Sequence, residues 1–252
     1  MSVVHAKNIV VFGAMGAGKS SLVNLIAGKR IAETGSDLKR CTLTWIKYEL
    51  PNLLDDGEQY NIFDTMGIEN PEIEPREYHE SIKNASRLLR ALESSGGTNL
   101  LVYCIQQGRV SSALQSNYQL FREVLYQGRV PIVMIVTRLE EERDMEEWWT
   151  RNEEELERFK IAVKGHACVT TLTEEGVKYK TSREAVRKLI REQADVPPVL
   201  GGWKKEGLVG AFKRQFRLRT DPKEDKLQKD LVSQCGMKKK LASKVAKTIM
   251  YT

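Results

Sequence analysis

A glycine-rich segment near the N-terminus has the residue types and the spacing of a phosphate-binding loop. It reads G-A-M-G-A-G-K-S from Gly13 to Ser20, between an apolar run at Lys7–Phe12 and an amphipathic stretch at Lys19–Ala27. Glycines let backbone amides turn inward around phosphate oxygens, and the helix that follows directs its N-terminus at the same anion. A turn that binds nothing is the alternative, but the flanking strand and helix favour nucleotide binding.

The positions of this loop predict how it binds a nucleotide with Mg²⁺. Lys19 reaches the β- and γ-phosphates, and the Ser20 hydroxyl takes one place on Mg²⁺. The other positions supply backbone amides. We therefore expect nucleotide contacts from Gly13, Ala14, Met15, Gly16, Ala17, Gly18, Lys19, Ser20 and Ser21.

A second motif follows the next buried strand along the chain. Asp64-Thr65-Met66-Gly67 has D-x-x-G spacing and ends the strand expected at Gln59–Asp64. There the aspartate orients a water on Mg²⁺, and the Gly67 amide senses the γ-phosphate. Such spacing occurs by chance in many chains, so its place after the strand carries the prediction. The next residue is Ile68, where Ras-like switches have a glutamine that positions the attacking water.

A further Mg²⁺ ligand is expected from a threonine in the loop before the strand at Leu43–Leu50. Thr42 is the first candidate and Thr44 the second, although either could equally be an ordinary strand residue. The predicted metal ligands are Ser20, Thr42 and Asp64, and the catalytic candidates are Thr42 and Gly67.

The third motif, Thr137-Arg138-Leu139-Glu140, has the position of the element that recognises guanine. A carboxylate at Glu140 accepts hydrogen bonds from guanine N1–H and from the N2 amino group, and the Arg138 stem covers one face of the base. Adenine lacks this pair of donors, so such a site rejects it by about 10⁴-fold or more. Glu141 or Glu142 could recognise the base instead, and a solvated acidic helix start is the structural alternative.

Two more pairs of residues are candidates for the base pocket. Thr170 and Thr171 come directly after Val169, at the end of the last expected strand, where backbone amides contact the base. Trp148 and Trp149 lie in an otherwise acidic stretch and could shield the base or face a partner, but core packing is the expected role for one of them.

The elements around these motifs alternate between apolar β-branched runs and amphipathic stretches, which predicts an α/β fold with a mostly parallel sheet and helices on both faces. The six expected strands are Lys7–Phe12, Leu43–Leu50, Gln59–Asp64, Asn99–Ile105, Val130–Val136 and Ala167–Thr171, the second and third forming an antiparallel hairpin. Helices are expected at Lys19–Ala27, Glu77–Ser94 and Glu141–Lys164, and after capping boxes at Ser112/Gln115 and Thr181/Glu184. This is the three-layer arrangement of a P-loop NTPase with a Ras-like G domain.

The three motifs, in this order, resemble those of the septin-related GTPases. The similarity is greatest to the immunity-associated (GIMAP-like) group and to the chloroplast-envelope import GTPases, including single-domain fungal relatives. It rests on the phosphate loop, the T-R-x-E form of the base motif and the segment Leu100–Ser111, which contains Gly108-Arg109. The similarity extends from about Lys7 to Glu192. It implies homodimerisation across the nucleotide face, favoured by GTP.

The +6 net charge of the 252 residues is unevenly distributed. From Gly201 to Thr252 there are 14 Lys and Arg against 5 Asp and Glu, so the first 200 residues have a net charge of −3. We expect a G domain at residues 1–198 and a basic, helical extension at 199–252. That extension either packs on the G domain or is weakly attracted to an anionic membrane surface. Nucleic acid is an unlikely partner because no reading module is recognisable.

Cysteine usage and hydropathy indicate the compartment. The cysteines are widely separated, which predicts free buried thiols in a reducing environment. No apolar run approaches the roughly 20 residues of a membrane-spanning helix, and a strand at Lys7 leaves no room for a secretory signal. We expect a cytoplasmic protein that is at most peripheral to a membrane.

These observations favour a guanine-nucleotide-binding protein that hydrolyses GTP slowly to GDP and phosphate with Mg²⁺. As a switch, it would order Thr42 and Asp64–Pro75 around GTP and release them on hydrolysis. Arg109 or Glu69 could orient the water in place of the missing glutamine. The alternatives are a nucleotide-dependent assembly module with incidental hydrolysis and a P-loop ATPase or kinase, although no Arg-rich insert suited to a kinase lid lies between the motifs.

Overall fold

The computed structural model describes residues 6–34, 45–65, 87–172 and 176–200, together with six separate residues between 228 and 243. Within these residues the chain forms a six-stranded sheet in the order β2-β3-β1-β4-β5-β6. The strands are β1 (Lys7–Phe12), β2 (Trp45–Pro51), β3 (Gln59–Thr65), β4 (Leu100–Gln106), β5 (Ile132–Thr137) and β6 (His166–Cys168). All neighbours are parallel except β2 and β3, which pair antiparallel. The predicted α/β class and the β2–β3 hairpin are confirmed.

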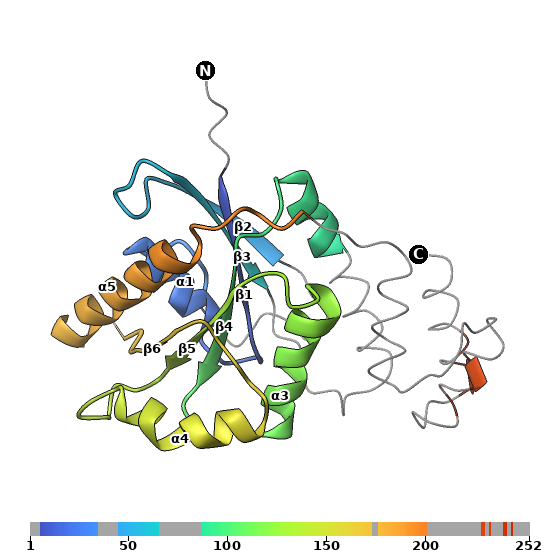
Figure 1. Cartoon of the computed structure of the whole chain (residues 1–252). Coiled ribbons are helices and arrows are strands. Elements are labelled where there is room, and N and C mark those ends of the chain that lie inside the picture. The colour runs from blue at the N-terminus through green and yellow to red at the C-terminus, as the bar shows by residue number, and fades with distance from the viewer. Residues whose placement is uncertain are drawn as a thin grey trace.

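Helices cover both faces of the sheet, as Figure 1 shows. The helices are α1 (Lys19–Ala27), α3 (Ser112–Gln119) with a π-helical continuation (Leu120–Leu125), α4 (Glu147–Arg158) and α5 (Gly176–Gln193). Residues 87–94 are also helical. Strands covered on both faces read as nearly continuous apolar runs, and β1 is such a run. Its Ile9 and Val11 pack with α1 and α5, whereas Val10 and Phe12 pack with α3 and α4.

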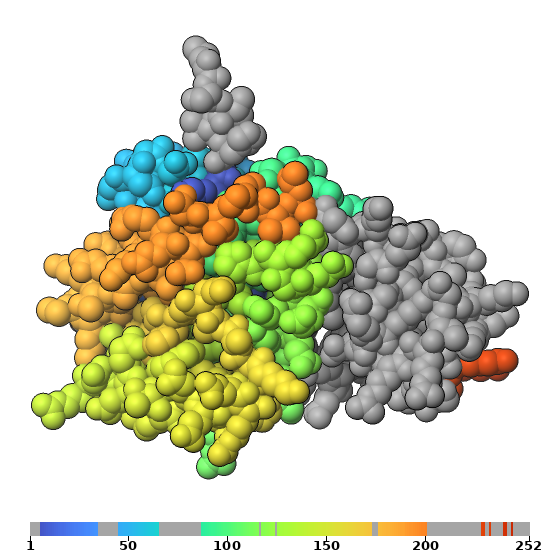
Figure 2. Space-filling view, in the orientation of Figure 1, coloured from blue at the N-terminus to red at the C-terminus, as the bar shows by residue number. Residues whose placement is uncertain are grey.

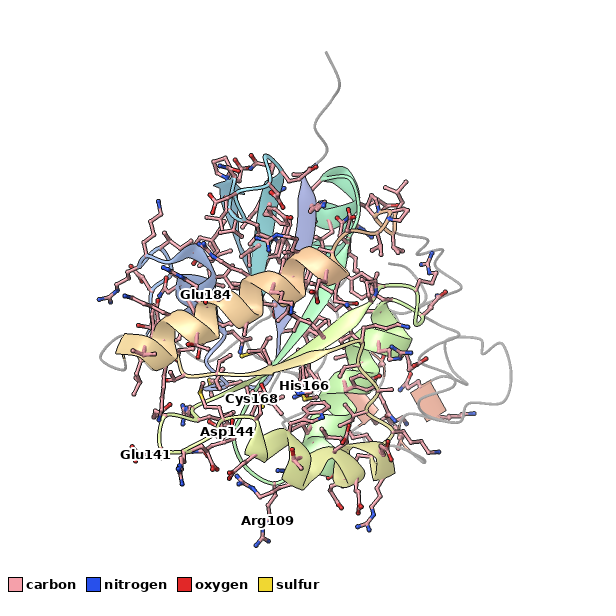
Figure 3. The ribbon with its side chains drawn as sticks, turned by 60° about the vertical axis from the view of Figure 1, so that its left-hand side comes forward. Arg109, Glu141, Asp144, His166, Cys168 and Glu184 are labelled. Atoms are coloured by element: carbon pink, nitrogen blue, oxygen red, sulfur yellow. The ribbon has the colours of Figure 1, made fainter. Side chains whose placement is uncertain are left out.

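The helix boundaries differ from the sequence predictions in three places. The first turn of α3 is capped by Ser111, one residue before the predicted cap Ser112, and the Ser111 Oγ accepts the Leu114 N–H at 3.4 Å. Helix α5 begins at Gly176, five residues before Thr181. Figure 3 accordingly shows Glu184 within α5 and not at its start.

Helix α4 is half as long as the predicted Glu141–Lys164. It ends because Lys160 adopts a positive φ of 54°. The Ile161 and Lys160 amides then bond back to the carbonyls of Leu156 and Glu157, at 2.9 and 2.8 Å, which is a Schellman termination. Figure 2 shows the surface of α4 (yellow) below that of α5 (orange).

The expected burial of the cysteines is met where the structure describes them, because Cys104 and Cys168 are buried and free. Of the two tryptophans, Trp148 is 4% exposed in the core. Trp149 is partly buried and stacks on His166 with ring centroids 3.7 Å apart. At the C-terminal end of the described domain, Val199 forms a two-way antiparallel bridge with Thr98. No helix within the described residues has the length and hydropathy needed to cross a membrane.

Candidate functional site

The phosphate-binding loop lies between the end of β1 and the start of α1, and its three glycines, Gly13, Gly16 and Gly18, all have positive φ values at which a side chain would be strained. Gly13 has φ 152°, and a Cβ on it would lie 2.0 Å from the carbonyl oxygen of Cys104 on β4. Gly18 has φ 87° and is the N-cap of α1. Both values are rare for residues with a side chain. The loop therefore follows the sheet closely and directs the first amides of α1 inward.

Lys19 occupies the centre of this loop. Its side chain is 7% exposed, and its ammonium donates to the carbonyls of Ala14 at 2.7 Å and Gly13 at 3.2 Å. Desolvation lowers the pKa of Lys19, and the nearby Asp64 carboxylate acts in the opposite direction. A poorly solvated cation among inward-directed amides is suited to bind a multiply charged anion such as a nucleotide phosphate.

The first residue after Lys19 connects the loop to the second motif. The Ser20 hydroxyl donates a 2.7 Å hydrogen bond to Oδ2 of Asp64, which lies in β3. Desolvation raises the pKa of Asp64 despite this hydrogen bond and the charge of Lys19. One hydroxyl and one carboxylate side by side fit Mg²⁺, which takes oxygen ligands and usually one or two from protein, the rest being water and phosphate. Ser20 and Asp64 would hold the ion, which would neutralise phosphate charge.

The remaining predicted residues of the phosphate end are only partly described. Ala14 and Met15 are exposed at the tip of the loop, and Ser21 is half-buried in the first turn of α1. The predicted metal ligand Thr42, its alternative Thr44, and Gly67, Ile68 and Glu69 lie outside the described residues.

The third motif begins at the end of β5, next to the phosphate loop. Thr137 is fully buried, and its hydroxyl lies 2.8 Å from the Ala17 carbonyl and 3.1 Å from that of Ile105. Arg138 has a positive φ of 66° and donates from Nη2 to the Gly16 carbonyl at 2.9 Å. Both residues therefore tie the third motif to the phosphate loop.

The three candidate carboxylates have different surroundings. Glu140 is half-buried, and its Oε2 lies 3.4 Å from the Thr170 hydroxyl, just beyond β6. Glu142 is engaged in an ion pair with Arg151 of α4. Glu141 is exposed, and Figure 3 shows it directed away from the protein. Only Glu140, of these three, contacts Thr170 in the segment after β6. The geometry therefore favours Glu140 over Glu141 and Glu142 as the candidate carboxylate for base recognition.

Sequence reasoning missed the residues that support this end of the site from α5. Lys178 Nζ donates to the backbone carbonyl of Glu140 at 2.6 Å, and the Ser182 hydroxyl accepts the Thr170 N–H at 3.1 Å. The only signal in the sequence is their four-residue spacing, which places them on one side of a helix. Arg109, a candidate water-orienting group, is exposed and points away from the protein in Figure 3.

Comparison with protein families identifies the class of nucleotide. Residues 8–138, from β1 to the third motif, match the family described as 50S ribosome-binding GTPase. The chain belongs to this family of P-loop GTPases. It is thus a GTP-binding GTPase domain, with a six-stranded G-domain fold. A search of the curated proteins gave no match.

Two solved structures share this fold at low sequence identity. Era in complex with MgGDPNP and 16S ribosomal RNA is 13% identical with a TM-score of 0.54, covering 98% of this chain and 89% of that one. A dimerisation-deficient mutant of Toc33 from Arabidopsis thaliana is 14% identical with a TM-score of 0.51, covering 76% and 85%. The chain spans about half the length of SsGBP bound to GDP (17% identity, TM-score 0.49, 75% and 51% covered).

Proposed function

We propose that this GTPase is a molecular switch whose nucleotide state is transmitted through Asp64. The observation that carries the proposal is the 2.7 Å hydrogen bond between Ser20 and Asp64. It unites the phosphate loop with the last residues of β3, immediately before the segment that contains Gly67. GTP and Mg²⁺ hold Thr42 and the segment Asp64–Pro75, and loss of the γ-phosphate releases both.

Hydrogen exchange measured by mass spectrometry tests the switch. With Mg²⁺ and a non-hydrolysable GTP analogue, peptides covering residues 35–44 and 66–75 exchange more slowly than with GDP. Peptides from β4 serve as the internal control and exchange equally in both states. Equal exchange of all these peptides with GTP analogue and GDP contradicts the switch.

The proposed binding residues are those of the motifs, and the contacts of Lys19, Ser20, Asp64, Thr137, Arg138 and Glu140 support them. Gly13–Ser21 surround the phosphates, Ser20, Thr42 and Asp64 bind Mg²⁺, and the Gly67 amide senses the γ-phosphate. At the base end, Glu140 accepts the two guanine donors, Arg138 covers the base, and Thr137 supports the loop from within the core. A P-loop ATPase is the alternative, and competition against labelled GDP distinguishes the two. On an ATPase, unlabelled ATP would displace labelled GDP as well as unlabelled GDP does.

Hydrolysis is proposed to be slow. Ile68 cannot hydrogen-bond to water at the position where Ras-like switches use glutamine. Basal turnover of the isolated monomer is expected about three orders of magnitude or more below the 1–100 s⁻¹ typical of kinases. Multiple-turnover phosphate release near one per second contradicts this proposal.

A GIMAP-like or septin-like relationship, which rests on the motif resemblance, would make this protein a GTP-dependent homodimer. A second copy across the nucleotide face could supply a group in trans. Light scattering with a GTP analogue, with GDP and without nucleotide tests this, and a monomer at high concentration with the analogue contradicts it. Growth beyond a dimer with any nucleotide favours the alternative of an assembly module.

The basic extension at 199–252 is proposed to contact anionic membrane surfaces weakly from a cytoplasmic location. Each Lys or Arg near such a surface contributes about 1 kcal/mol, and the described Lys239 and Lys240 are exposed. Sedimentation with acidic liposomes at low and physiological salt compares the full chain with a chain that ends at Asp221. Equal pelleting of the two removes the membrane role.

A further inference from the structure

The base end of the site is supported by one side of α5. Lys178 and Ser182 lie four residues apart, so their side chains share a face of the helix. The N-terminal part of α5 that carries them lies beside the loop that follows β5, as the hydrogen bonds require and Figure 1 shows. Neither residue belongs to a GTPase motif of this sequence, and neither is explained by packing alone.

Lys178 holds the backbone of the base-recognition turn. The Glu142 N–H bonds to the Leu139 carbonyl at 3.2 Å, which closes a turn over Leu139–Glu142. The Lys178 ammonium donates to two carbonyls of this turn, those of Glu140 at 2.6 Å and of Glu142 at 3.2 Å. One cation thereby fixes two peptide groups of the turn. Fixing these peptide groups also fixes the direction in which the Glu140 side chain leaves the backbone.

Ser182 acts on the Glu140 carboxylate through Thr170. Ser182 is 1% exposed, and its hydroxyl accepts the Thr170 N–H at 3.1 Å. Thr170 is fully buried, and its hydroxyl lies 3.4 Å from Glu140 Oε2. The Thr170 hydroxyl also accepts the Leu172 N–H at 3.2 Å, so its proton is left to point at the carboxylate.

A glutamate has one more rotatable bond than an aspartate, so more side-chain entropy is lost when it is held in one geometry. Guanine recognition needs both carboxylate oxygens in place at once, one for N1–H and one for the N2 amino group. We propose that Lys178 and Ser182 are positioning residues for guanine recognition: Lys178 fixes the turn that carries Glu140, and Ser182 fixes the threonine that orients its carboxylate. This inference rests on the proposed role of Glu140.

Binding of GDP and of IDP to the full-length protein with Mg²⁺ tests the proposal, because inosine keeps N1–H and lacks the 2-amino group. Lys178→Met retains much of the stem and removes the donors. It is expected to weaken GDP about five- to tenfold, the range of one or two hydrogen bonds, and IDP less. The preference for GDP over IDP therefore shrinks. Lys178→Arg retains the preference, and Lys180→Met, at an exposed position of the same helix, changes neither ligand.

The outcomes separate the proposal from its premise. Equal weakening of GDP and IDP by Lys178→Met means that the lysine is merely structural and overturns the proposal. An unchanged GDP preference in Glu140→Ala overturns the role of Glu140 itself. If circular dichroism shows that Lys178→Met does not fold, Ser182→Ala is measured in its place. The same loss of preference for GDP over IDP is expected. Equal weakening of GDP and IDP by Ser182→Ala overturns the proposal.

Discussion

The hydroxyl of Thr137 lies 2.8 Å from the carbonyl oxygen of Ala17 and joins the base motif to the phosphate loop across 120 residues of sequence. The same hydroxyl lies 3.1 Å from the Ile105 carbonyl of the neighbouring strand. Cys104 Sγ approaches the Ala17 carbonyl from beneath, at 3.1 Å. The phosphate loop is therefore held by β4 and β5 before any nucleotide binds.

Replacing Thr137 with valine, which has the same shape, removes this donor. A carbonyl in a buried residue loses a hydrogen-bond donor, which destabilises the nucleotide-free protein by about 1–3 kcal/mol. Urea unfolding of the variant measures the difference. Thr150→Val, at an exposed position of α4, is the control and changes stability by less than about 0.5 kcal/mol. Equal changes in unfolding free energy for the two substitutions mean that the Thr137 hydrogen bonds do not stabilise the protein.

Gly13→Ala tests the close approach of the phosphate loop to β4. Gly13 and Gly108 have nearly the same φ, 152° and 148°, but a Cβ on Gly108 meets no atom within 4 Å. Gly108→Ala therefore measures backbone strain alone, about 1–3 kcal/mol. Gly13→Ala adds a clash with the Cys104 backbone and is expected to cost about 2 kcal/mol more. Similar unfolding free energies for the two variants contradict the close approach.

The fold was predictable from sequence because its strands are covered on both faces. β1 is apolar at every position from Ile9 to Phe12, and this pattern is typical of a strand buried between two layers of helices. The phosphate loop was predictable because its chemistry needs glycines at fixed positions, and Gly13 and Gly18 do adopt dihedrals that favour glycine.

The ends of elements near the third motif were predicted less well, because contacts distant in sequence decide them. β6 stops at Cys168 and not at Thr171, since the Thr170 N–H bonds to Ser182 of α5 and leaves the ladder. The π-helical turn in α3 places the Tyr126 N–H on the Phe121 carbonyl at 3.0 Å. No local pattern encodes either bond, and none encodes the reach of Lys178 to Glu140.

The pKa of Lys19 is lowered by desolvation, and phosphate binding requires the ammonium. Affinity for GDP is therefore greatest below the lowered pKa of Lys19 in the free protein and declines as pH rises through that pKa. The decline begins at a lower pH than for a lysine with the ordinary pKa of 10.5. Calorimetry between pH 7 and 10 in buffers of different ionisation enthalpy is expected to show proton uptake on binding at the alkaline end. Proton uptake that begins at no lower pH than a freely solvated lysine would show contradicts the lowered pKa.

Asp64 is a buried carboxyl whose raised pKa reflects desolvation. The folded protein therefore binds the carboxyl proton of Asp64 more tightly than the unfolded chain does. Above the raised pKa, ionised Asp64 opposes folding, and this destabilisation fades as pH falls through that pKa. Asp64→Asn is expected to raise the melting temperature of the nucleotide-free protein at pH 7 while weakening Mg²⁺-dependent GDP binding. A lower melting temperature combined with intact binding contradicts both roles.

Guanine recognition by Glu140 is the central claim, and a change of one atom in the side chain tests it. In Glu140→Gln the amide presents one acceptor and one donor. Xanthine carries N1–H and a carbonyl at C2, which match this pair, whereas the guanine 2-amino group meets a second donor. Glu141→Gln, at the exposed neighbour, is the control. Competition between GDP and XDP against a labelled nucleotide is expected to show GDP preferred by the wild type and by Glu141→Gln, and XDP preferred by Glu140→Gln. A Glu140→Gln protein that still prefers GDP contradicts the account.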